Sequence, residues 1–135
     1  MPLSAQDALI HLMVVTASSD TGISGSELIR IDDLIGRLPI FADYERGRLT
    51  GVANACVDQI NGSIGLDGVL DAAVAALPTR LHDTAYALSV EVAVVDLRLP
   101  QEELRLLEMI RDRLEVDRLV TAAIEVAARA RLRKA

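Results

Sequence analysis

Hydrophobic and polar residues follow one another along this chain with the spacing of α-helices. From Ser4 to about Ser18 the apolar residues recur three or four positions apart and leave only a narrow polar stripe, which predicts a largely buried first helix. The segment 85–95 is apolar on nearly all sides, as is typical of a central buried helix. No segment carries a convincing strand pattern. The predicted helices cover residues 4–18, 24–38, 44–61, 66–77, 79–95, 100–114 and 117 to the basic C-terminal turn.

The predicted helix ends carry suitable capping residues. Ser4 and Asp117 have side-chain oxygens that can accept from the free backbone N–H groups of a first helical turn. We expect Asp43 to cap the third helix in the same way and Gly62 to end it in a left-handed turn. These patterns together predict an all-α fold, a single bundle-like domain of about seven helices over residues 1–135.

The chain contains an internal repeat of a helix, an acidic loop and a second helix. Asp20 and Glu27 lie seven positions apart, and 76 residues further on Asp96 and Glu103 have the same spacing. Flanking residues match at the same offset, which indicates two similar halves. The identical pairs are Leu12/Leu88, Val14/Val90, Ala17/Ala93, Asp20/Asp96, Glu27/Glu103, Leu28/Leu104, Arg37/Arg113 and Leu38/Leu114. We expect a pseudo-two-fold axis between the halves, with helices one and five packed together.

Composition narrows the classes of function. Half of the residues are hydrophobic but only 2% are aromatic, so Ala, Val, Leu and Ile must fill the core. The formal net charge is −6, and residues 1–128 alone carry −10 because Arg129, Arg131, Arg133 and Lys134 close the chain. A body this acidic argues against nucleic acid as a partner and is compatible with a bound cation. The basic end is most simply a helix terminus, and a surface for an anionic partner is the alternative.

Cysteine usage and hydropathy point to a soluble protein. The single cysteine, Cys56, cannot form an internal disulfide, and the chain starts without a basic-then-apolar leader. No apolar run reaches the roughly 18–20 residues that span a bilayer. These features predict a cytoplasmic protein without a membrane span.

The two acidic loops are the candidate binding sites. Asp20 and Glu27 in the first loop, and Asp96 and Glu103 in the second, are the candidate ligands of a divalent cation, Ca²⁺ or a similar ion, together with loop carbonyls and water. Each loop supplies two carboxylates, whereas Ca²⁺ prefers roughly six to eight oxygens. We therefore expect a modest affinity.

A structural alternative exists for the same carboxylates. Ser24 and Glu27 have the spacing of a capping box, in which each side chain accepts from the backbone N–H of the other residue. In the second loop Pro100 replaces the serine and cannot complete such a box, so the alternative does not account for Glu103. If a cation binds, the first loop is the better site because glycines such as Gly22 can turn carbonyls inward.

The remaining residues that could carry chemistry have simpler explanations. His11 and His82 lack His, Cys or Glu at ligand spacing, and we expect them to be solvated or half-buried. Cys56 is expected to be a small core residue. Glu91 is expected on the one solvent-exposed face of helix five. The sequence has no phosphate-binding loop, nucleophile elbow or metalloprotease motif. We therefore predict a protein that is not an enzyme.

With both loops placed, the chain resembles the tellurite-resistance TerB family of small helical proteins. In that family each half carries an Ala-Asp-Gly-type loop followed by Glu in the next helix. The segment 17–27 matches with its glycine displaced by one residue, and the segment 93–103 keeps Asp and Glu but has no glycine. The resemblance implies an all-helical fold, a link to divalent metal and a role in resistance to tellurite or other stress.

Two hypotheses of function follow. The first is a non-enzymatic, TerB-like stress-response protein that binds a divalent cation, a partner protein, or both through its acidic loops. The second is a purely structural interaction module, which forms a homodimer or docks through an exposed apolar helix face while its acidic loops only cap helices. Titration with divalent cations distinguishes the two.

Overall fold

The computed structural model describes residues 3–18, 22–93 and 101–135, apart from the side chains of 101–103. These residues form α-helices joined by turns and short 3₁₀ segments and contain no strand, which confirms the all-α prediction. The helices are α1 Ala5–Ala17, α2 Gly25–Arg37, α3 Leu49–Asn61, α4 Gly65–Ala75, α5 His82–Ala93, α6 Gln101–Arg113 and α7 Arg118–Arg131. The 3₁₀ segments are η1 Pro39–Phe41, η2 Arg46–Arg48 and η3 Thr79–Leu81.

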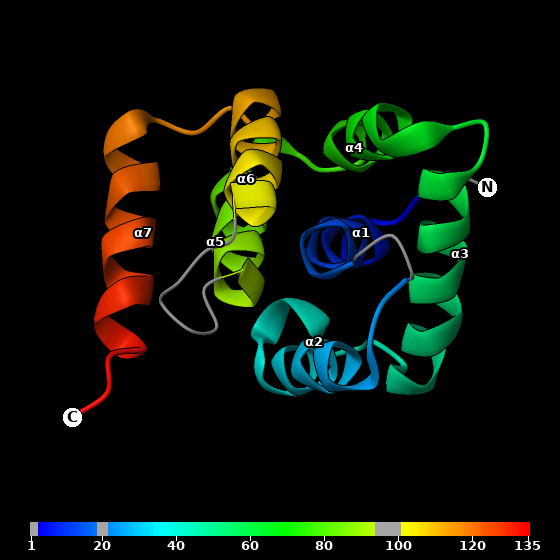
Figure 1. Cartoon of the computed structure of the whole chain (residues 1–135), viewed down its shortest axis with the longest axis horizontal. Helices are drawn as coiled ribbons and strands as arrows, with labels where there is room; N and C mark the ends of the chain where they lie inside the picture. Colours follow the sequence, from blue (N-terminus) through cyan, green and yellow to red (C-terminus); the bar gives the residue numbers. More distant parts are fainter. Residues whose placement is uncertain (1–2, 19–21, 94–100) are drawn as a thin grey trace.

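Helix α1 is the centre of the fold. Every residue from Ala8 to Thr16 is buried, as expected for a helix with only a narrow polar stripe. Figure 1 shows α1 nearly end-on, with α2, α3 and α4 around it and the α5–α6 pair on the remaining side. The apolar core therefore forms around the first helix of the chain, and the later helices cover it.

The capping predictions hold at three helix starts. Ser4 Oγ accepts from Asp7 N–H at 3.1 Å at the start of α1. Ser24 Oγ accepts from Glu27 N–H at 3.3 Å at the start of α2, and Asp117 Oδ1 accepts from Leu119 N–H at 3.4 Å at the start of α7. Each of these bonds satisfies a backbone donor that the helix itself cannot pair.

The predicted start of the third helix at Tyr44, with Asp43 as its cap, is wrong. The 3₁₀ turn η2 lies in this region, and α3 begins only at Leu49. The later start of α3 is caused by Tyr44, which is buried. Its hydroxyl donates a hydrogen bond to Asp7 Oδ1 at 2.8 Å. Its ring also meets Phe41 edge-on, with 5.9 Å between the ring centroids. These contacts with α1 and with η1 hold the segment in a shape that a continuous helix from Asp43 could not adopt.

The left-handed turn after α3 is also displaced from its predicted position. Gly62 has an extended backbone with φ of −100°. Gly65, at the start of α4, has φ of 72°, a conformation that residues with a side chain rarely adopt. The chain thus leaves α3 in an extended conformation and makes its left-handed turn three residues later.

The expected packing of helix five beside helix one is confirmed, whereas the internal repeat stays a prediction. Helix α5 follows η3 and packs beside α1, as expected for the two central helices. Leu12 and Leu88 are both buried, and so are Ile31 and Leu107, two aliphatic residues that are also 76 positions apart. The pseudo-two-fold axis itself stays a prediction. The predicted helix end at Val95 and the start at Pro100 lie outside the described residues.

Helix α7 has a different environment from the other helices. It lies at one edge of the molecule and packs mainly against α5 (Figure 1). Its two buried residues, Thr121 and Ala128, mark the face toward the body. Among the described helices none has both the length and the hydropathy required to cross a membrane.

Candidate functional site

Of the four predicted cation ligands, the structure describes the side chain of only one. Asp20 and Asp96 lie outside the described residues, and so does the side chain of Glu103. Glu27 is in the first turn of α2, where the positive end of the helix dipole favours a carboxylate. Within the described part of the chain, no three His, Cys, Asp or Glu side chains gather closely enough to hold a metal ion.

The Glu27 carboxylate is only partly accounted for by capping. Ser24 caps the Glu27 N–H, but the described residues contain no return bond from Ser24 N–H to the Glu27 side chain. The Oε2 atom of Glu27 is buried and has no hydrogen-bond partner. Because a buried polar atom without a partner is disfavoured, this oxygen favours a ligand over a simple cap among the described residues of the first loop.

The two histidines are buried, so the prediction of solvated or half-buried side chains was wrong. Burial lowers the pKa of His11, and the nearby charge of Asp7 only partly opposes this effect. His82 Nδ1 accepts from Glu115 N–H at 2.9 Å, so its proton is on Nε2, which donates to Leu77 O at 3.2 Å. His82 therefore connects the end of α4 to the loop before α7.

Cys56 is a core residue, as predicted. Its side chain is fully buried, and this burial raises the pKa of the thiol to about 12. A thiol in this state is a poor nucleophile near neutral pH. Neither this cysteine nor the two histidines thus provides an activated group for catalysis.

A groove runs between α2, α5 and α7. Its volume is about 350 Å³, and the residues that line it are mainly aliphatic. Leu34 and Arg37 of α2 line it together with Leu38, which directly follows that helix. Helix α5 contributes Ala87, Leu88 and Glu91, and helix α7 contributes Ile124, Ala127, Ala128 and Arg131. An apolar floor of this kind suits aliphatic side chains of a ligand or partner.

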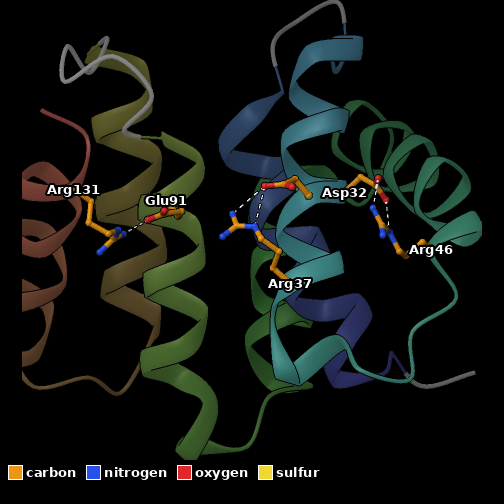
Figure 2. Close-up of polar contacts among 6 residues, drawn as sticks. Asp32, Arg37, Arg46, Glu91 and Arg131 are labelled. Atoms are coloured by element: carbon orange, nitrogen blue, oxygen red, sulfur yellow. Dashed lines mark hydrogen bonds and ion pairs between the residues drawn. The ribbon is translucent and has the colours of Figure 1, made fainter. Parts of the chain in front are cut away.

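Ion pairs stand along both sides of this groove (Figure 2). Arg131 on α7 pairs with Glu91 on α5. The Glu91 side chain is 26% exposed, close to the solvent-facing position predicted for it. On α2, Arg37 pairs with Asp33 at 3.0 Å. Exposed pairs of this type contribute little to stability, so the arginines can exchange partners at low cost.

A third pair lies on the far side of α2. The Arg46 guanidinium reaches Asp32 at 2.7 Å (Figure 2). A Cβ atom at Gly36 would come within 2.7 Å of Arg46 Nη1, so the glycine leaves space for this approach. The pair connects η2 to α2.

A second hollow flanks α7 on the side of α6. Its volume is about 410 Å³, and its lining is more polar than that of the groove. Glu125 at this hollow accepts a hydrogen bond from Tyr86 Oη at 2.6 Å and lies 3.9 Å from Arg111. Burial, together with this bond, raises the pKa of Tyr86 far above its usual range. Helix α7 is thus a ridge with a depression on each side.

The outer face of α7 is apolar and uncovered. We define the α7 outer face as Leu119, Ala123, Val126 and Ala130, all of them exposed. Leu119 is 76% exposed and Val126 is 54% exposed. At about 100° per residue the four lie within an arc of roughly 60°, opposite Thr121 and Ala128. Large exposed aliphatic residues clustered on one face mark an interaction site.

Sequence reasoning assigned α7 correctly but missed this surface. The signal was present, because the four residues of the α7 outer face are spaced four, three and four positions apart. This is the spacing of a helix–helix seam. The sequence alone does not show that the larger residues, Leu119 and Val126, point away from the body while Thr121 points toward it.

Comparison with known proteins adds no assignment to this geometry. No protein-family model matches the chain, and neither a curated protein nor a solved structure is similar enough to match. The resemblance to the TerB family therefore stays a prediction that rests on the two acidic loops.

Proposed function

We propose that this chain is a non-enzymatic helical interaction protein that binds an apolar helix of another polypeptide through α7. The observation that carries the proposal is the α7 outer face, where Leu119 and Val126 are 76% and 54% exposed. A helix that uses one face to join the body and exposes a second apolar face is suited to bind a partner helix.

Several features support this choice over catalysis. The groove beside α7 offers aliphatic residues for further contact, and its rim carries charged side chains such as Arg37 and Arg131. An apolar centre with a polar rim is the usual composition of a protein–protein interface. Two of the described residues that could serve in catalysis, Cys56 and His82, are buried, and His82 accepts a hydrogen bond from the Glu115 backbone.

The proposal predicts position-specific crosslinking in cells that make this protein. A photoreactive side chain introduced at Val126 should form an adduct with a polypeptide, whereas the same side chain at the exposed Ala55 of α3 should not. Leu119→Asp should abolish the Val126 adduct because it places a charge on the α7 outer face. The matched change Ile29→Asp, at an exposed aliphatic residue of α2, should leave it intact. Absence of any adduct from Val126 would overturn the proposal.

A second candidate function is cation binding in the manner of a TerB-like stress-response protein, and the buried Glu27 Oε2 without a partner favours it. The expected site combines Glu27 with Asp20, and the repeat would place a weaker one at Asp96 and Glu103. Carboxylate oxygens are the ligands that Ca²⁺ and Mg²⁺ prefer.

Calorimetric titration with Ca²⁺, Mg²⁺, Mn²⁺ and Zn²⁺ tests this candidate. We expect binding in the wild type, loss of it in Asp20→Asn/Glu27→Gln, and retention in Asp96→Asn/Glu103→Gln, because only the first loop has glycines to turn carbonyls inward. Failure of the wild type to bind any of these ions at millimolar concentration would show that the loops only cap helices.

A further inference from the structure

We infer that the helix bound by the α7 outer face is α7 of a second copy of this chain, packed antiparallel about a two-fold axis. This inference rests on the proposed function and specifies the partner.

The α7 outer face is complementary in shape to itself. Its residues alternate in size in the order Leu119, Ala123, Val126, Ala130. Antiparallel pairing about an axis between 124 and 125 places Leu119 opposite Ala130 of the second copy, and Ala123 opposite Val126. Every large side chain then meets a small one, which lets two helices approach closely. Parallel pairing would set leucine against leucine and leave alanine against alanine.

The charges at the two ends of α7 also favour antiparallel pairing. The C-terminal end of α7 and the residues after it carry Arg129, Arg131, Arg133 and Lys134, whereas Glu115 and Asp117 precede the helix with Arg118 beside them. Antiparallel pairing brings each basic end to the end that holds the two carboxylates, and it also opposes the two helix dipoles favourably. Parallel pairing would bring two strongly basic ends together. The charges therefore select the same orientation as the side-chain sizes.

The short length of α7 limits the affinity of this dimer. Helix α7 has 14 residues, and at 1.5 Å per residue it is about 21 Å long. One face of such a helix is smaller than the roughly 800 Å² that each partner buries in a standard stable complex. We therefore expect a reversible dimer whose population depends on protein concentration.

Sedimentation equilibrium of the purified chain tests the inference. The wild type should pass from monomer to dimer across the micromolar to millimolar range. Val126→Glu should weaken dimerisation at least about 100-fold, since a symmetric interface contains the buried charge twice. The same substitution at Ile29, which is 71% exposed on α2, should leave the dimer unchanged. Both variants change exposed residues, so their helical circular dichroism should equal that of the wild type.

Cysteine crosslinking tests the orientation. A mixture of Leu119→Cys and Ala130→Cys chains should form a mixed disulfide on mild oxidation, whereas Leu119→Cys alone should not. In the antiparallel dimer two copies of position 119 are about 16 Å apart, beyond the reach of a disulfide. The native Cys56 is fully buried and does not interfere. Rapid disulfide formation by Leu119→Cys alone would overturn the antiparallel arrangement.

The outcomes separate this inference from the proposed function. A wild type that stays monomeric to millimolar concentration, while Val126 crosslinks in cells to a polypeptide of another mass, would overturn the dimer and leave the interaction surface standing. A monomeric wild type with no adduct in cells would overturn both. A concentration-dependent dimer that Val126→Glu abolishes and Ile29→Glu does not would support both.

Discussion

Replacement of Leu12 by alanine is expected to lower the free energy of unfolding by about 3–5 kcal/mol, the upper part of the range for a buried leucine. Leu12 is 0% exposed in the middle of α1, so truncation leaves a closed cavity. Leu88, which corresponds to Leu12 in the predicted repeat, is 6% exposed and lines the groove. Truncation there opens onto solvent, and we expect a smaller loss of about 2–3 kcal/mol.

Urea denaturation followed by circular dichroism measures both losses. Ile29→Ala is the control, because Ile29 is 71% exposed and its truncation should change stability by less than about 0.5 kcal/mol. If Leu12→Ala and Ile29→Ala unfold at the same urea concentration, α1 is not the centre of the core.

The second large effect is expected at His82. A leucine there keeps much of the side-chain volume but removes the acceptor of Glu115 N–H and the donor to Leu77 O. Two polar backbone groups then lose their partners, which should cost about 2–4 kcal/mol. Thermal unfolding measures the change, and the exposed neighbour Arg80, replaced by alanine, is the control. Equal melting temperatures for the two variants would show that His82 does not connect these segments.

Local capping chemistry made several helix ends predictable. Ser4, Ser24 and Asp117 cap the helices that follow them, since an N-cap needs only an oxygen within three residues. The prediction that Asp43 caps the third helix was wrong because the Tyr44 hydroxyl donates a hydrogen bond to Asp7, which is 37 positions away in the sequence. Periodicity carries no information about a contact over that distance.

Burial of the histidines was unpredictable for a similar reason. The polar stripe of α1 predicts that His11 faces solvent, but the surrounding helices bury it. One partner of His82, Leu77, is only five positions away, but Glu115 is 33 positions away in the loop after α6, so that bond forms only when the fold brings the two segments together. A sequence pattern shows which face of a helix is polar and does not show whether that face meets water.

The sequence likewise allowed only part of the candidate site to be predicted. Apolar residues on two faces of α7 were visible in the sequence, but the choice of inner and outer face was not. The usual rule would bury Leu119 and Val126, whereas the structure buries Thr121 and Ala128 and leaves the larger pair exposed. Of the acidic loops, only Glu27 can be compared with its predicted role, and its unpaired oxygen keeps the cation hypothesis open to test.

The central position of α1 also determines when this protein can complete its folding during synthesis. Residues 8–16 are buried by α3, α4, α5 and α6, all of which are made later. At roughly 5–20 residues per second, a ribosome needs about 4–15 s to extend the chain from Ala17 to Ala93. During that time α3 and α4 can cover only part of this 13-residue helix. The apolar surface that α5 and α6 will bury stays exposed until they are made, which favours binding of holding chaperones to the nascent chain.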